Sequence, residues 1–244
     1  MLPKIIAHRG DSAHCVENTL TSFRSAISAG ADALEMDLIR CGSGEIVVSH
    51  DMELTRLAGR SNQIAYLTWD ELAGIEIHAP GRPELTDRLC RLDDVFSDPT
   101  ISEVISGPKG LWLCLELKDD DLERDVVALT KNVGAFEQTV FYSFRGERLA
   151  GIIAQDPAAK TNLLFGDRKW EELKAAAQIG CWSVNPEHRD ADPAYIFAAH
   201  SEGLEVSVGN ENDPAKMPQL FDLNVWGVHS DDPGALKDTR DRVS

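Results

Sequence analysis

The chain has 244 residues, of which 43% are hydrophobic and 27% charged, and its formal net charge is -17 at pH 7. This length fits one α/β domain with a full core, and the negative charge argues against nucleic acid or an anionic membrane as the main partner. The five cysteines are scattered without a CxxC motif, which is typical of reduced thiols in a cytoplasmic protein. No apolar run of 18 residues occurs, so we expect no membrane anchor. The sequence is compatible with a monomer and with a homo-oligomer.

The N-terminal part of the chain predicts a strand, a helix and a strand hairpin. A short apolar segment at 4–7 is typical of a buried strand. Apolar residues at helical spacing predict a helix over 19–29, with Asn18 placed to cap its start. A strand over 33–39 follows, and a Gly-rich turn leads to an apolar segment at 46–49. Because this connection is too short for a parallel crossover, we expect the last two segments to form a hairpin.

Later strand candidates mostly alternate with helices. They lie at 111–117, 139–144, 161–165, 181–184, 204–208 and 225–229. With the hairpin return set aside as an accessory, eight strands remain, which is the pattern of a (β/α)8 TIM barrel in the α/β class. A doubly wound open sheet is the competing architecture, but no GxGxxG motif follows the first strand to favour it.

Residues 52–110 do not show this alternation of strands and helices. They contain several Pro and Gly residues and only short helical patches, such as 69–73. We interpret them as a small inserted cap over the barrel rim, because they hold too few apolar residues for a core of their own. The whole chain, 1–244, is then a single domain.

Two carboxylates share one face of the strand at 33–39. Glu35 and Asp37 are two residues apart, so their Cα atoms lie roughly 6.6 Å from each other on the same side. If the hairpin closes on its turn, His50 returns level with Asp37. Such a group would be costly in a core without a cation. A solvated acidic face on an edge strand is the competing interpretation.

A third carboxylate follows the same logic on another strand. Glu116 and Lys118 share one face at the end of the segment 111–117. Catalytic groups of a barrel lie at the C-terminal ends of its strands, so Glu116 can converge with Glu35 and Asp37. Three hard oxygen ligands without a cysteine suit one divalent cation, Mg²⁺ or Ca²⁺, better than zinc.

Histidines and basic residues also occupy strand ends. His8 and His50 can give and take a proton near neutral pH, and Arg9 and Lys118 are suited to a phosphate oxygen. His229 ends the last strand, a position from which it could reach the same pocket, and a structural histidine is the competing interpretation. A cation with two basic side chains and two imidazoles indicates phosphoryl transfer.

An ordered set of motifs resembles the glycerophosphodiester phosphodiesterase family over almost the whole chain. The motifs are His8-Arg9-Gly10, Glu17-Asn18-Thr19, Glu35-Met36-Asp37, His50-Asp51, Glu116-Leu117-Lys118, Ser143-Phe144, Val184-Asn185-Pro186 and Ser230-Asp231-Asp232-Pro233. The resemblance implies a (β/α)8 barrel with a small cap, and a divalent cation held by Glu35, Asp37 and Glu116. It also implies acid and base catalysis by His8 and His50.

The implied reaction hydrolyses a phosphodiester to a phosphomonoester and an alcohol. A substrate hydroxyl next to the phosphoester attacks phosphorus with one histidine as base, the other histidine protonates the leaving alcohol, and water opens the cyclic phosphate. The resemblance adds Glu17 as an active-site carboxylate and Asn18 as a polar contact. A plain helix N-terminus is the competing interpretation of these two residues. Asp51 is expected to orient His50.

One position departs from the family pattern. Family members usually carry a Trp in a V-W-T-V-N-like run, where it lines the glycerol pocket, and here Gly209 stands in its place. The change opens the pocket, and Asn210 and Glu211 add hydrogen-bonding groups. We therefore expect a bulkier or more polar substrate, such as a sugar phosphodiester of the agrocinopine type.

Two other functions compete with a phosphodiesterase. The first is a catalytically silent barrel that binds a phosphorylated sugar, although a binding protein needs neither His8 nor His50. The second is a metal-dependent carbon-carbon lyase on the same fold, which does not need Arg9 and Lys118 as a phosphate clamp.

Overall fold

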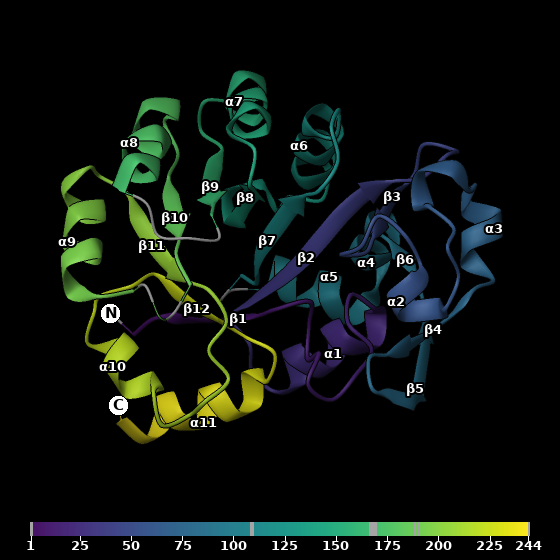
Figure 1. Cartoon of the computed structure of the whole chain (residues 1–244), viewed down its shortest axis with the longest axis horizontal. Coiled ribbons are helices and arrows are strands. Elements are labelled where there is room, and N and C mark those ends of the chain that lie inside the picture. Colours follow the sequence, from purple (N-terminus) through teal and green to yellow (C-terminus); the bar gives the residue numbers. More distant parts are fainter. Residues whose placement is uncertain (1, 108–109, 166–169, 188, 190, 244) are drawn as a thin grey trace.

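Eight parallel strands close into a barrel in the computed structural model, which describes residues 2–107, 110–165, 170–187, 189 and 191–243 (Figure 1). The strands are β1 (Lys4–Ala7), β2 (Ala33–Arg40), β7 (Trp112–Leu117), β8 (Thr139–Ser143), β9 (Lys160–Leu164), β10 (Ser183–Asn185), β11 (Glu205–Val208) and β12 (Gly227–Ser230). Strand β1 pairs in parallel with both β12 and β2, so the sheet has no free edge there. This closure confirms the barrel and excludes the open doubly wound sheet.

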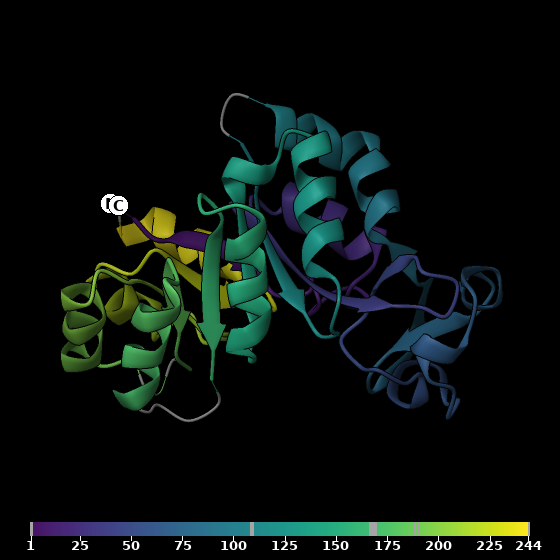
Figure 2. The ribbon, with the colours of Figure 1, turned by 90° about the horizontal axis from the view of Figure 1, so that it is seen from above.

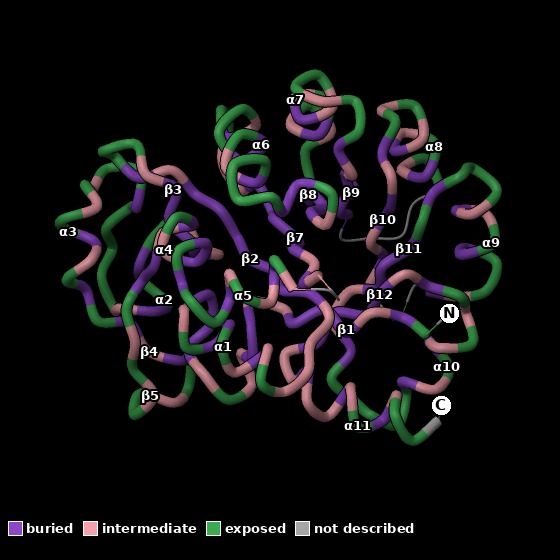
Figure 3. Tube along the Cα trace, turned by 180° about the vertical axis from the view of Figure 1, so that it is seen from behind, coloured by how far each residue is buried: buried purple, intermediate pink, exposed green. Residues whose placement is uncertain are grey.

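Helices surround the barrel, and Figure 3 shows the buried strands inside the exposed outer faces of these helices. The helices are α1 (Leu20–Ser28), α4 (Leu92–Ser97), α5 (Pro99–Ser106), α6 (Glu123–Asn132), α7 (Gly146–Gln155), α8 (Trp170–Ile179), α9 (Pro193–Ser201), α10 (Met217–Phe221) and α11 (Pro233–Val243), with a short 3-10 turn η2 (Phe136–Gln138). No helix among the described residues combines the length and apolar character needed to span a bilayer.

The two faces of β2 have different roles, as its alternating sequence predicts. Leu34, Met36 and Leu38 are fully buried in the apolar layer between the strands and the helices. Burying one such side chain contributes about 1.5–3 kcal/mol to folding. The residues between them, Glu35 and Asp37, therefore face the barrel interior.

Three tryptophans pack at the N-terminal end of the barrel. Trp112 begins β7, and Trp182 and Trp226 lie just before β10 and β12. The rings of Trp112 and Trp182 stack 6.2 Å apart, and the Trp226 ring meets them edge-on at 5.2 and 5.1 Å. They pack below the interior layer that contains Ile6 and Tyr142. This end of the barrel is filled with side chains, whereas the opposite end carries the polar residues.

The cap of α1 differs from the prediction. Thr19, and not Asn18, is the N-cap: its hydroxyl accepts a hydrogen bond from the Ser22 N–H, and the Ser22 hydroxyl accepts one from the Thr19 N–H. Asn18 has a left-handed φ of 56° and turns its side chain toward Asp37 instead. A side chain that holds a strand residue cannot also cap the helix.

The insertion after β2 forms a small unit beside the barrel, visible at one side in Figure 2. It comprises β3 (Ile46–Val48), α2 (Thr55–Ala58), the 3-10 turn η1 (Ile64–Tyr66), α3 (Trp69–Ala73), the antiparallel pair β4 (Glu76–Ala79) and β5 (Arg82–Arg88), and β6 (Cys90–Arg91). Strand β3 pairs antiparallel with β2, as the hairpin prediction requires.

Two details of the predicted cap need correction. The insertion does bury apolar residues of its own, including Leu57, Ile64 and Leu72, together with Ile39 of β2 and Val47 of β3. It also ends near β6 and not at residue 110, because α4 and α5 pack into the main apolar layer of the barrel. The sequence did not reveal this small core, because its apolar residues lie on short elements that show no long periodicity.

We expect Gly10→Ala to destabilise the fold more than a glycine change without a close neighbour. Gly10 has φ +82°, and a Cβ there would lie 2.4 Å from the Ser22 hydroxyl oxygen and 2.7 Å from its backbone carbonyl carbon. Left-handed strain and overpacking together should lower the free energy of unfolding by about 2–4 kcal/mol.

Gly59→Ala is the matched control for this prediction. Gly59 has φ +65° but nothing within 4 Å of the added Cβ, so only the backbone cost of about 1 kcal/mol applies. Urea unfolding of both variants measures the difference. Equal losses would contradict the close packing of the His8-Arg9-Gly10 turn on α1.

Candidate active site

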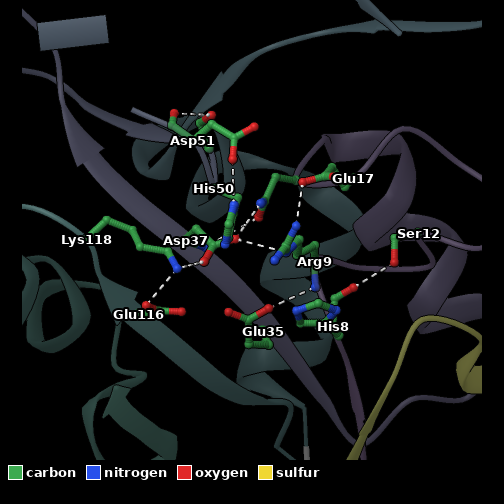
Figure 4. Close-up of polar contacts among 12 residues, drawn as sticks. His8, Arg9, Ser12, Glu17, Glu35, Asp37, His50, Asp51, Glu116 and Lys118 are labelled. Carbon is green, nitrogen blue, oxygen red and sulfur yellow. Dashed lines mark hydrogen bonds and ion pairs between the residues drawn. The ribbon is translucent and has the colours of Figure 1, made fainter. Parts of the chain in front are cut away.

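A cavity of about 440 Å³ opens at the C-terminal ends of the barrel strands. Seven of the ten predicted site residues line it: His8, Arg9, Glu35, His50, Glu116, Lys118 and Gly209. Asp37, Glu17 and Asn18 lie behind this wall. Asp37 contacts Lys118 and Glu17 contacts Arg9, as Figure 4 shows, and the Asn18 amide donates to Asp37. The strand-end rule therefore places residues from β1, β2, β7 and the turn after β3 around one space.

The three predicted metal ligands meet in the barrel. Asp37 pairs with Glu116 in the register between β2 and β7, and Glu35 lies two residues before Asp37 on the same face. One carboxylate oxygen from each residue lies within 4.8 Å of the other two. The residues are 4%, 1% and 8% exposed, which rules out the solvated acidic face that the sequence had left open.

Two basic side chains oppose the three carboxylates (Figure 4). Lys118 Nζ lies 2.7 Å from Glu116 Oε1 and 3.2 Å from Asp37 Oδ1. Arg9 Nε lies 3.4 Å from Asp37 Oδ2, and the Arg9 backbone N–H donates to Glu35 Oε2 at 2.9 Å. Two positive charges do not balance three negative ones, so one buried negative charge is left over.

The carboxyl groups respond to this imbalance with different pKa values. Burial, then the Asp37 charge, raises the pKa of Glu116 from 4.5 to about 7, and burial together with the same charge raises the pKa of Glu35 well above 4.5. Burial acts in the same direction on Asp37, but Lys118 and Arg9 outweigh it and lower the pKa of Asp37 to about 2. Asp37 thus stays ionised, and either a proton or a cation must neutralise its neighbours.

The donor set fits a hard divalent cation. Carboxylate oxygens are the ligands that Mg²⁺ and Ca²⁺ prefer, and no thiol or imidazole stands among the three residues. A divalent ion would allow both Glu35 and Glu116 to ionise, and it would convert the excess of one negative charge among the ionised groups to an excess of one positive charge. That positive charge would face the cavity, where an anionic substrate could enter.

Each of the two predicted catalytic histidines has a carboxylate on Nδ1. His50 Nδ1 lies 2.7 Å from Asp51 Oδ1, as the prediction for Asp51 requires. His8 Nδ1 lies 2.6 Å from Asp231 Oδ1 and 2.8 Å from the Asn210 amide nitrogen. The carboxylate favours a proton on that nitrogen, which leaves Nε2 as the exchanging nitrogen. A His8 Nδ1–H that donates to Asp231 cannot also accept a hydrogen bond from the Asn210 amide group.

His50 titrates in a strongly charged environment. Burial lowers the pKa of the His50 imidazole, Asp37 and Asp51 raise it, and the positive charges of Arg9 and Lys118 lower it, with a net decrease. A neutral imidazole is therefore favoured at neutral pH, and a neutral ring can accept a proton.

Glu17 and Asn18 act on other site residues. Glu17 Oε1 accepts from Arg9 Nη1 at 2.9 Å, so it orients the guanidinium group. The Asn18 amide donates to Asp37 Oδ2 at 2.8 Å, and its oxygen accepts from the Asp37 N–H at 3.3 Å. Asn18 is 1% exposed and is absent from the cavity wall, so its direct contact with substrate stays a prediction.

The far side of the cavity is polar. Gly209 lies there with Asn185, Glu187 and Asn210. His229 also lines the cavity, as its strand-end position predicts, and its ring meets Tyr142 edge-on at 5.7 Å. Burial, then the nearby His8, lowers the pKa of His229 to about 3, so this imidazole stays neutral at physiological pH.

The sequence interpretation missed two supporting residues. Asp231 directly follows β12, so the strand-end rule could have assigned it to the site together with its motif. Arg56 lies on α2 of the insertion, and its guanidinium group contacts both Glu17 and Asp51. No periodicity or strand-end position could have indicated that contact, because it depends on how the insertion folds back on the barrel.

Known proteins resemble the chain in sequence over most of its length. The sequence model of the glycerophosphoryl diester phosphodiesterase family matches residues 8–235. The chain is 25% identical over 241 residues to a glycerophosphodiester phosphodiesterase of Caldanaerobacter subterraneus, with 95% of each chain covered. It is 35% identical over 250 residues to a glycerophosphodiester phosphodiesterase of Bacillus altitudinis, which covers 99% of this chain and 100% of that protein.

Solved structures share the fold. The glycerophosphodiester phosphodiesterase of Agrobacterium tumefaciens superposes with a TM-score of 0.80 at 22% identity, over 97% of this chain and 100% of that one. A phosphodiesterase of Oleispira antarctica, solved in complex with the product sn-glycerol-3-phosphate, superposes with a TM-score of 0.81 at 24% identity, over 98% and 97% of the two chains. With a family match over most of its length, the chain belongs to the glycerophosphoryl diester phosphodiesterase family, and it is a phosphoric diester hydrolase.

Proposed function

We propose that the protein uses one divalent cation, Mg²⁺ or Ca²⁺, to hydrolyse a small phosphodiester to a phosphomonoester and an alcohol through a cyclic phosphate. The observation that carries this proposal is the pair of imidazoles, His8 and His50, on the wall of the cavity that also holds Glu35 and Glu116. A protein that only bound a phosphorylated ligand would need no such pair. The net charge of -17 favours a small molecule over nucleic acid as substrate, and the cysteine pattern favours a cytoplasmic location.

The proposed mechanism assigns a task to each group. Arg9 and Lys118 orient the phosphoryl oxygens and balance charge that develops on them. One of His8 and His50 removes the proton from the substrate hydroxyl next to the phosphoester, and the other protonates the leaving alcohol. The two histidines then exchange roles as water opens the cyclic ester. Asp51 holds the His50 ring during both steps, as Asp231 does for His8.

Glu35, Asp37 and Glu116 would hold the cation. When bound, it supplies Lewis-acid stabilisation of negative charge on the phosphoryl group. Lys118 and Arg9 already neutralise part of the carboxylate charge, so a single divalent ion suffices.

The alcohol part of the substrate would occupy the side of the cavity near Gly209. Asn185, Glu187 and Asn210 line that side and offer both donors and acceptors of hydrogen bonds. A polyol such as a sugar could satisfy them better than an apolar group could. We therefore propose a sugar phosphodiester of the agrocinopine type as a preferred substrate. The product bound to the Oleispira antarctica protein makes a glycerophosphodiester the reference substrate for comparison.

We expect His8→Asn and His50→Asn each to lower kcat on glycerophosphocholine by about 10²- to 10⁴-fold, because each removes a proton-transfer group. His78→Asn is the matched control, since His78 lies on β4 outside the cavity. EDTA should abolish wild-type activity, and Mg²⁺ or Ca²⁺ should restore it. An analogue without the hydroxyl next to the phosphoester should resist hydrolysis. Turnover of that analogue would rule out the cyclic phosphate, and full activity in EDTA would rule out the cation.

The contribution of Glu116 to the stability of the cation-free protein should fall as the pH rises from about 5 to 7. The pKa of Glu116 is about 7 in the folded protein against 4.5 ordinarily, so in this window the folded state binds more protons than the unfolded state. The loss from Glu116 alone is on the order of 3 kcal/mol. Thermal unfolding in EDTA at several pH values measures it. Glu116→Gln and saturating divalent cation should each remove this contribution, so the stability then falls less with pH, or rises more, than in the cation-free wild type. An unchanged slope in Glu116→Gln would contradict the assignment.

Gly209→Trp should shift the preference from a sugar phosphodiester toward glycerophosphocholine. The indole would fill the open side of the cavity, although a Cβ at Gly209 already lies 3.3 Å from both the Asn185 amide nitrogen and the Pro186 carbonyl oxygen. Gly209→Ala is therefore the control for local crowding, and it should leave the ratio of the two kcat/KM values nearly unchanged. The same ratio in Gly209→Trp as in the wild type would count against a sugar subsite.

A further inference from the structure

Arg56 connects the insertion to the active site through all three nitrogens of its guanidinium group. Nε donates to Asp51 Oδ2 at 2.6 Å. Nη1 and Nη2 donate to the two oxygens of Glu17 at 2.6 and 2.8 Å. The contact with Glu17 is a two-point pairing of a planar guanidinium with a carboxylate, which fixes orientation as well as distance. The Glu17 side chain is 9% exposed and the Arg56 side chain 35%, so water reaches the guanidinium group while the Glu17 oxygens are largely shielded.

Each of these carboxylates holds a catalytic or phosphate-binding group on its other side. Asp51 Oδ1 lies 2.7 Å from His50 Nδ1, and Glu17 Oε1 accepts from Arg9 Nη1 at 2.9 Å. Arg56 thus stands in the middle of one continuous chain of charged contacts that runs from His50 to Arg9. Hydrogen bonds to ionised groups are short and strong, so the chain transmits position from one end to the other.

We propose that Arg56 is a positioning residue that sets the His50 ring and the Arg9 guanidinium at once. The inference rests on the proposed function, in which these two groups act on the same phosphoryl group. Without Arg56, Asp51 and Glu17 lose their common partner. The His50 and Arg9 side chains that they hold then become more mobile. A displacement of about 1 Å at a reacting group can lower a rate about 10²-fold.

The position of Arg56 depends on the fold of the insertion. Helix α2 is one turn long, and its Leu57 is buried in the core of the insertion. Gly59 ends the helix with a left-handed φ of 65°. The insertion therefore contributes the Arg56 side chain to the support of the active site, in addition to forming part of its rim.

Arg56→Gln and Arg56→Lys test the proposal on glycerophosphocholine. We expect kcat to fall by about 10- to 100-fold in both variants while KM changes less, because the phosphate-binding side chains remain present. Lysine should rescue little, since a point charge cannot pair with two carboxylates in the guanidinium geometry. Arg60→Gln is the matched control: Arg60 lies four residues further along the insertion, is exposed, and should leave kcat unchanged.

A double-mutant cycle separates positioning from a loss of folding. If Arg56 acts through Asp51, Arg56→Gln should have a several-fold smaller effect on kcat in an Asp51→Asn background than in the wild type. Multiplicative effects of the two changes would overturn the proposal, as would an unchanged kcat in Arg56→Gln. A wild-type protein without phosphodiesterase activity would instead refute the proposed function, and this inference with it.

Discussion

Three carboxylates buried at one end of a closed barrel are the constraint on which the site depends. Glu35, Asp37 and Glu116 are brought together by the register of β2 and β7, and all three are buried. Their mutual repulsion and desolvation must be offset locally. Arg9 and Lys118 supply part of the compensation, and the remainder is left to a proton or a cation. Under the proposed function, the same imbalance would give the pocket its affinity for a divalent cation.

The aspartates that hold His8 and His50 have different partners of their own. Asp231 comes from the end of a barrel strand, and it accepts hydrogen bonds from the neutral groups Ser12 and Asn212. Asp51 is instead paired with the positive charge of Arg56. A carboxylate that already pairs with a cation attracts a proton on its histidine less strongly than one that does not. The two rings therefore lie in different electrostatic environments although each has an aspartate on Nδ1.

The sequence was sufficient for the barrel and most of the site because both follow from local periodicity. Alternation along β2 assigned Leu34 and Met36 to the helix layer and Glu35 to the interior, and the rule of strand ends gathered His8 and Glu116. Contacts across the insertion could not be predicted in this way. The pairing of Arg56 with Glu17 and Asp51 depends on tertiary packing of short elements. The capping role predicted for Asn18 was wrong, because its side chain binds Asp37 on β2 and leaves Thr19 to cap the helix.

The tryptophan cluster at the opposite end of the barrel affects how substrate enters the site and how products leave it. Because Trp112, Trp182 and Trp226 fill that end, we expect substrate, water and both products to enter and leave at the C-terminal end of the barrel. Under the proposed mechanism, the alcohol must depart before water can take its place beside the cyclic ester. The phosphomonoester is then the last species to leave, so it would compete directly with incoming substrate for the empty enzyme.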